Sequence, residues 1–140
     1  MKKKYITNSE KETYNLAEQF ASTLSGHETV CMVGDLGSGK TAFTKGLASG
    51  LGVEKIITSP TFVLMKNYQG NKFSLAHIDA YRLSNSDELE AIGVDDYIKN
   101  KKCITVIEWA DRVRDIWPSD CIEINFKTLK GDEREINIKK

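Results

Sequence analysis

Residues 34–41 can form a loop that binds phosphate. Gly34, Gly39, Lys40 and Thr41 occupy every fixed position of the pattern Gly-x-x-x-x-Gly-Lys-[Ser/Thr]. Glycines let consecutive backbone N–H groups turn inward without Cβ clashes, which makes a concave anion site at the start of a helix. Lys40 would bring a positive charge to the β- and γ-phosphates of a nucleotide, and the Thr41 hydroxyl can bind Mg²⁺.

The residues on both sides of this loop have the periodicity that such a loop needs. Residues 28–33 form a short apolar run that is typical of a buried strand. After the loop, apolar residues recur at helical spacing, and Gly50 and Gly52 mark where the helix ends. A glycine-rich turn carrying a surface lysine is the alternative, and it requires both the full pattern and the strand–loop–helix order to coincide by chance.

Two carboxylates at predicted strand ends can serve a bound metal ion or orient water. Residues 103–109 form a β-branched run typical of a central parallel strand, and Glu108 lies at its end. Glu108 is the stronger candidate for a Mg²⁺ ligand, because such a strand points its carboxyl end at the phosphate-loop edge of the sheet. Asp79 ends the second arm of a predicted hairpin formed by 63–68 and 72–78. Which of the two acids orients the attacking water stays open.

Two further segments have a functional and an ordinary interpretation. The hydroxyl residues Thr58, Ser59 and Thr61 belong to a loop that either closes over the γ-phosphate, as switch loops do, or is a polar turn before a strand. Trp109 follows the strand of Glu108 and is either packed at the rim of the core or placed where it reports nucleotide binding; packing is the default interpretation.

The remaining elements complete an α/β fold. Ser9 and Glu12 predict a capping box for an amphipathic helix that ends near Gly26. Short acidic helices are expected between Asp79 and Asp96, and residues 121–126 and 134–138 predict a closing antiparallel hairpin. The fold class expected is a P-loop NTPase-type mixed sheet flanked by helices, with antiparallel hairpin strands, in one domain spanning 1–140.

Composition limits the function classes. The 140 residues carry 20 basic and 20 acidic side chains, so the positive surplus of a protein that binds nucleic acid by itself is missing. No apolar run reaches membrane-spanning length, and an odd number of cysteines in apparent strands fits a reducing cytoplasm. A chain of this size is expected to handle any large substrate with a partner.

Five ordered stretches resemble the TsaE family, the small bacterial P-loop ATPases needed for the threonylcarbamoyl modification of adenosine in tRNA. They are residues 34–41, 59–62, 77–83, 93–97 and 107–109. The resemblance implies ATP and Mg²⁺ as cofactors and homologues of TsaB and TsaD as partners, with tRNA reached only through that complex. It also implies that ATP hydrolysis resets the complex after each turnover.

The resemblance assigns roles to individual positions. It implies that Mg²⁺ binds Thr41 and Glu108, that Lys40, Asp79, Glu108 and Thr61 serve hydrolysis, and that Trp109 and Arg134 lie beside the nucleotide. The residues expected to contact the nucleotide are Gly34, Asp35, Leu36, Gly37, Ser38, Gly39, Lys40, Thr41, Ala42, Trp109 and Arg134.

Three other functions are weighed against this one. A small-molecule kinase on the same scaffold needs a lid that carries arginines, and Arg112 and Arg114 are the only pair available. A nucleotide-dependent scaffold would bind ATP and act without turnover. A GTPase is less favoured, because residues 100–103 lack the final acid of the guanine-binding motif Asn-Lys-x-Asp.

Overall fold

A single seven-stranded sheet forms the middle of the molecule. The computed structural model describes residues 2–58, 60 and 63–140, and within them the strand order is β1-β7-β6-β2-β5-β4-β3. The strands are β1 (Lys2–Thr7), β2 (Thr29–Gly34), β3 (Met65–Gln69), β4 (Ser74–Asp79), β5 (Cys103–Glu108), β6 (Ile122–Thr128) and β7 (Arg134–Lys139).

Four parallel strands form the central part of the sheet. β2 pairs with β5 and β6, and β5 pairs with β4, all in parallel. The flanking pairs β3–β4, β6–β7 and β1–β7 are antiparallel, which confirms the two predicted hairpins. Parallel strands end at the same edge of a sheet, so the residues that follow β2, β4 and β5 meet there. The mixed sheet of the predicted fold class is confirmed.

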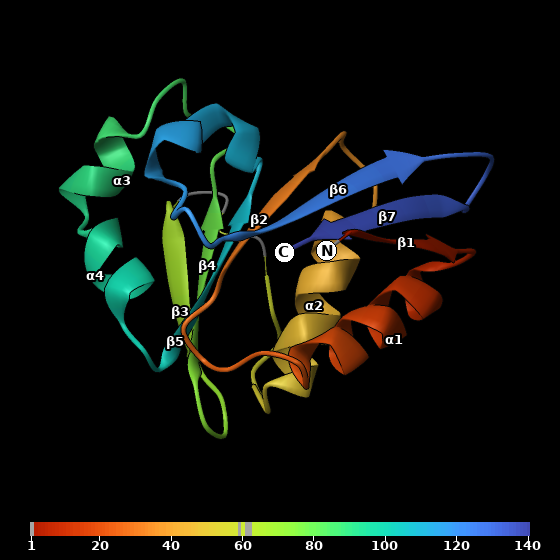
Figure 1. The fold of residues 1–140 in the computed structure, drawn as a ribbon, viewed down its shortest axis with the longest axis horizontal. Coiled ribbons are helices and arrows are strands. Elements are labelled where there is room, and N and C mark those ends of the chain that lie inside the picture. The colour runs from red at the N-terminus through yellow and green to blue at the C-terminus, as the bar shows by residue number, and fades with distance from the viewer. Residues whose placement is uncertain (1, 59, 61–62) are drawn as a thin grey trace.

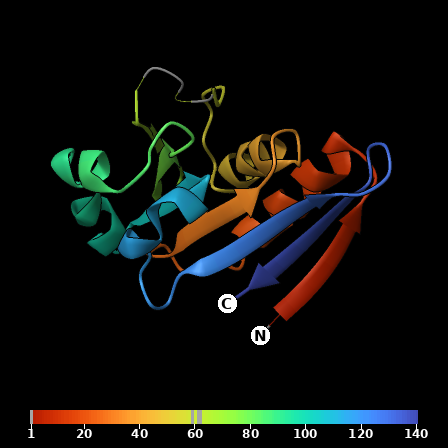
Figure 2. The same ribbon diagram turned by 90° about the horizontal axis from the view of Figure 1, so that it is seen from above.

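Helices cover both faces of this sheet (Figures 1 and 2). α1 (Glu10–Ala21) and α2 (Lys40–Gly50) pack together on one face, where the apolar core joins both helices to the sheet. The other face carries α3 (Asp87–Ala91), α4 (Val94–Lys99) and the 3-10 helix η1 (Ala110–Ile116), which share a second core. The predicted short acidic helices are therefore present, and both carry acidic residues in the first turn.

Phe43 anchors the helix that follows the phosphate loop. Its side chain is fully buried, and its ring lies 5.7 Å from that of Phe20 on α1 and 5.5 Å from that of Phe126 on β6. Tilted and edge-on aromatic pairs at these separations are favourable in addition to the burial of apolar area. The start of α2 is thus fixed against both a helix and a strand.

The helix α1 begins where the sequence predicts and ends earlier. The Ser9 hydroxyl accepts a hydrogen bond from the Glu12 N–H at 3.1 Å, as in a capping box, but the Glu12 carboxylate accepts from the Asn8 N–H instead of that of Ser9. The predicted end near Gly26 is wrong, because the helix stops at Ala21. The hydroxyls of Ser22 and Thr23 donate to carbonyls of the last turn, which ends the helix before the glycine.

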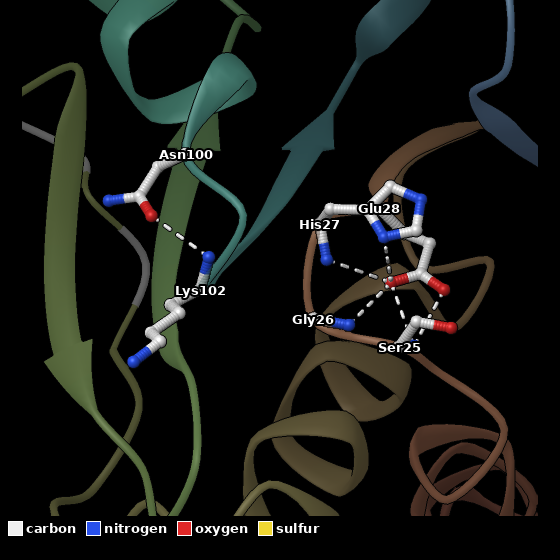
Figure 3. Close-up of polar contacts among 6 residues, drawn as sticks. All are labelled: Ser25, Gly26, His27, Glu28, Asn100 and Lys102. Atoms are coloured by element: carbon white, nitrogen blue, oxygen red, sulfur yellow. Dashed lines mark hydrogen bonds and ion pairs between the residues drawn. The ribbon is translucent and has the colours of Figure 1, made fainter.

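Side chains fix the turns that lead into the two central strands (Figure 3). Before β2, the Glu28 carboxylate accepts hydrogen bonds from the backbone N–H groups of Ser25, Gly26 and His27 at distances of 2.7–3.1 Å. Before β5, the Asn100 side-chain oxygen accepts from the Lys102 N–H at 2.9 Å. The strands that carry the phosphate loop and Glu108 are therefore entered through defined turns.

Glu28 should make the free energy of unfolding depend on pH in the acidic range. Burial is the largest single influence on its pKa and raises it, but the backbone N–H groups and His27 together outweigh burial and hold the pKa below its ordinary value of 4.5. A carboxylate with a depressed pKa contributes stability above its unfolded pKa and loses it as pH falls through the folded one.

The measurement is the free energy of unfolding of wild type and Glu28→Gln in urea between pH 7 and pH 3. We expect Glu28→Gln to be about 2 kcal/mol less stable at neutral pH, and the gap to close as the pH falls below 4.5. Glu10→Gln, an exposed acid on α1, serves as the control. A gap that stays constant down to the acid end would contradict the role given to the ionised carboxylate.

Candidate nucleotide-binding site

The loop between β2 and α2 has the backbone shape of an anion cradle. Gly37 and Gly39 have φ angles of 77° and 107°, a region that side chains with a Cβ atom rarely adopt. Gly39 also caps α2 without a side-chain hydrogen bond. The first N–H groups of the helix therefore have no intrahelical partner, and the positive end of the helix dipole points into the same space.

Lys40 lies folded against this loop. The side chain is 5% exposed, and its ammonium donates to the carbonyl oxygens of Gly34 and, at 3.0 Å, Asp35. The ammonium also lies 3.7 Å from the centre of the Trp109 ring, a cation–π contact. Burial lowers the pKa of Lys40 from 10.5, while nearby carboxylates, Glu108 foremost, act in the opposite direction.

Glu108 faces Thr41 across the pocket. Glu108 is 3% exposed, and its Oε1 lies 3.5 Å from the Thr41 hydroxyl oxygen. A hydroxyl and a carboxylate are the oxygen ligands that Mg²⁺ takes from proteins when phosphates and water complete its octahedron. In the described part of the chain, no group of three or more His, Cys, Asp or Glu side chains is placed to hold a metal ion.

Asp79 is the neighbour of Glu108 in the sheet. The parallel pairing of β4 with β5 places the two residues directly opposite each other at the carboxyl edge. One Asp79 oxygen accepts a hydrogen bond from the Tyr81 N–H at 2.9 Å, which holds the turn that leaves β4. Both predicted acids therefore line the same pocket as Lys40.

Arg134 reaches the phosphate loop from the far end of the sequence. It begins β7, and its Nε donates to the Gly37 carbonyl oxygen at 3.2 Å. A second guanidinium nitrogen donates to the Gly131 and Glu133 carbonyls, which ties the turn between β6 and β7 to the same side chain. The antiparallel pairing of β7 with β1 and β6 explains this position, because it brings the start of β7 to the edge where β2 ends.

One pocket collects most of the predicted residues. Its lining includes Leu36, Gly37, Gly39, Lys40, Thr41, Ala42, Asp79, Glu108, Trp109 and Arg134. The Gly34 and Asp35 carbonyls accept hydrogen bonds from Lys40, and Ser38 is a buried residue of the loop. Thr61 lies outside the described residues. The pocket also takes in Ser9 and Glu10 at the start of α1, and Thr13 and Asp132, which the site prediction left out.

Aromatic rings engage both of the arginines that a kinase lid would need. Tyr81 and Trp109 pack with ring centres 4.9 Å apart, and the Arg112 guanidinium lies 5.5 Å and 5.7 Å from the two rings. Arg114 lies 4.7 Å from the Trp117 ring. Both arginines belong to η1 and lie against aromatic rings, which does not favour the kinase alternative.

His77 was not predicted as a site residue. Its ring is fully buried, and Nε2 lies 2.5 Å from Glu108 Oε2. The contact depends on two strands lying side by side, which no local pattern reveals. A signal was nevertheless present, because His77 and Asp79 are two residues apart and alternation places both on one face of a strand.

The described part of the chain contains no helix long and apolar enough to cross a bilayer.

Comparisons with known proteins relate the chain to one family. The family model described as "Threonylcarbamoyl adenosine biosynthesis protein TsaE" matches residues 7–136. The TsaE protein of Bacillus subtilis is 38% identical over 133 residues, covering 95% of this chain and 82% of that protein. That of Aquifex aeolicus is 38% identical over 138 residues, covering 97% and 95%.

A solved structure extends the likeness to the fold. The crystal structure of Bacillus subtilis YdiB superposes with a TM-score of 0.85 at 32% identity, covering 99% of this chain and 84% of that one. The family match spans the phosphate loop, both strand-end acids and the start of β7. The chain therefore belongs to the TsaE family.

Proposed function

We propose that this chain is a Mg²⁺-dependent ATPase of tRNA threonylcarbamoyladenosine biosynthesis. The ATPase activity of the chain alone is weak. The chain forms one domain, acts in the cytoplasm and works together with homologues of TsaB and TsaD. The observation that carries the proposal is the pocket in which Lys40, Thr41 and Glu108 converge on the N-terminus of α2. Membership of the TsaE family supports the pathway.

The residues of the loop would hold the phosphates. Backbone N–H groups at the start of α2 donate to phosphate oxygens, and the Lys40 ammonium turns from the carbonyls of Gly34 and Asp35 toward the β- and γ-phosphates. Thr41 and Glu108 would hold Mg²⁺. When bound, the metal would neutralise the negative charge that develops on the phosphates during the reaction. Positioning and charge stabilisation account for most of the catalysis in such sites.

Asp79 would orient the attacking water. It lies beside Glu108 at the carboxyl edge and lines the pocket. Thr61 belongs to the segment proposed to approach the γ-phosphate. No covalent intermediate on the protein is required, because water attacks the γ-phosphorus directly and ADP leaves.

The outer end of the pocket would hold the base and ribose. The pocket runs from the phosphate loop to its outer end, which lies at the first turn of α1 and the turn before β7. Glu10, Asp132 and Arg134 line that outer end. The base would therefore lie between the N-terminus of α1 and the β6–β7 hairpin, with Trp109 at the opposite, phosphate end.

The test is ATP turnover with and without the two partners. We expect slow hydrolysis by the chain alone and a clear increase when TsaB and TsaD homologues are added together. We also expect repeated threonylcarbamoyl transfer to tRNA only when ATP is hydrolysed. Thermal-shift titration with ATP and GTP reports the base preference. Turnover that responds to a phosphate-accepting metabolite, and not to the proteins, would instead support the kinase.

A further inference from the structure

The contact between His77 and Glu108 lies inside the core. His77 is fully buried, the Glu108 side chain is 4% exposed, and the nitrogen and oxygen are 2.5 Å apart. Burying a polar pair is costly unless its members bond to each other. A histidine at the middle of a buried strand, beside a proposed metal ligand, therefore calls for a reason beyond packing.

The register of two strands creates this contact. β4 and β5 run parallel, with His77 opposite Val106 and Asp79 opposite Glu108. Residues two apart on a strand share a face, so His77 and Glu108 lie diagonally on the face that α2 covers. The His77 ring thus reaches Glu108 from the core side, and it does not line the pocket where Asp79 and Thr41 lie.

The two oxygens of the Glu108 carboxylate have different neighbours. Oε2 lies against His77 Nε2, and Oε1 lies 3.5 Å from the Thr41 hydroxyl oxygen. A carboxylate that is held through one oxygen cannot rotate freely, so the other oxygen keeps a fixed direction. In metal sites, partners of the ligand commonly fix its orientation in this way, and their loss weakens metal affinity.

No other polar group of the described residues holds the His77 ring. Its Nδ1 is buried and has no hydrogen-bond partner among them. A histidine kept for a structural network would be expected to use both ring nitrogens. Within the described parts of the chain, the Glu108 carboxylate is the only polar group that this side chain contacts.

We infer that His77 is a positioning residue for the metal: through Nε2 it holds Glu108 so that Oε1 faces Thr41 and the nucleotide phosphates. The inference rests on the proposed function, since it assumes that Glu108 is a Mg²⁺ ligand. His77 itself touches neither nucleotide nor metal and acts only through the orientation of Glu108.

The experiment measures Mn²⁺ affinity by electron paramagnetic resonance in the presence of a non-hydrolysable ATP analogue. His77→Leu and His77→Asn remove the donor, since leucine has none and the asparagine amide is too short to reach Glu108. His77→Gln places an amide nitrogen near the position of Nε2. Thr105→Val is the matched control, a buried polar residue of β5 that lies on the other face of the sheet.

We expect His77→Leu and His77→Asn to lower Mn²⁺ affinity by about 10-fold or more, with His77→Gln and Thr105→Val close to wild type. When EDTA removes the metal, the affinity for the nucleotide should be the same in all of these variants as in wild type. In a Glu108→Gln background, His77→Leu should have no further effect, because the two side chains act as one unit.

Two results separate the inference from the proposed function. If Glu108→Gln binds Mn²⁺ as wild type does, the assignment of Glu108 as a metal ligand is wrong and the inference goes with it. If Glu108→Gln is weakened while folded His77→Leu or His77→Asn binds Mn²⁺ normally, the inference about His77 alone is overturned. Equal losses with and without metal would also overturn it, because they would indicate general damage to the pocket.

Discussion

Replacing Lys40 with alanine will lower ATP hydrolysis by about 10²–10³-fold or more. The ammonium is the one cation that the phosphate-loop pattern supplies, and it lies in the pocket between the loop carbonyls and Trp109. Its loss removes charge stabilisation where negative charge develops on the transferred phosphoryl group. A side chain only 5% exposed leaves little room for water or another cation to substitute.

The measurement is steady-state release of phosphate by the chain with its partners, at saturating ATP. Lys45→Ala is the control, since Lys45 is an exposed lysine on the same helix, and its removal should leave turnover unchanged. Circular dichroism should show both variants folded. Wild-type turnover in folded Lys40→Ala would mean that the nucleotide is hydrolysed elsewhere.

Replacing Glu108 with glutamine will lower turnover by about 10²-fold, which corresponds to about 3 kcal/mol of transition-state stabilisation. The change keeps the shape of the side chain but removes the charge that attracts Mg²⁺. The Mg²⁺ concentration needed for half-maximal turnover should rise, while nucleotide binding in EDTA should stay the same. The contrast between the two conditions identifies a metal ligand.

A strand carboxylate on the other face provides the control for Glu108. Glu123 lies on β6 next to Cys31, away from the α2 face, and Glu123→Gln should behave as wild type. If Glu108→Gln kept the Mg²⁺ dependence of wild type, the metal would have to be held without this carboxylate. The proposal that Thr41 and Glu108 together hold Mg²⁺ would then be wrong.

Local patterns predicted the part of the site that is local. The phosphate loop, the strand before it and the helix after it follow from glycine spacing and apolar periodicity within residues 28–52. Glu108 was found because a continuous β-branched run is typical of a central parallel strand, and β5 does lie between β2 and β4. These inferences needed no knowledge of which strands pair.

The two hairpins were predicted, but pairings between strands that are distant in the sequence were not. The pairing of β1 with β7 joins the two ends of the chain, and no periodicity within either strand specifies its partner. The bond from Arg134 to the Gly37 carbonyl follows from that arrangement, as the bond between His77 and Glu108 follows from the register of β4 and β5. The early end of α1 has a local cause, in hydroxyls that compete for its last carbonyls.

Trp109 has a left-handed backbone with φ of 58°, the only such residue other than glycine among those described. A bulky residue holds this conformation at a cost of about 1–2 kcal/mol, so the surrounding contacts keep the indole where it is. The ring lies against the Lys40 ammonium, and the other tryptophan, Trp117, donates its indole N–H to the Ala110 carbonyl. When the ammonium moves from the ring to a phosphate, the fluorescence emission of Trp109 should therefore change. Intrinsic tryptophan fluorescence should then report nucleotide binding without an added label.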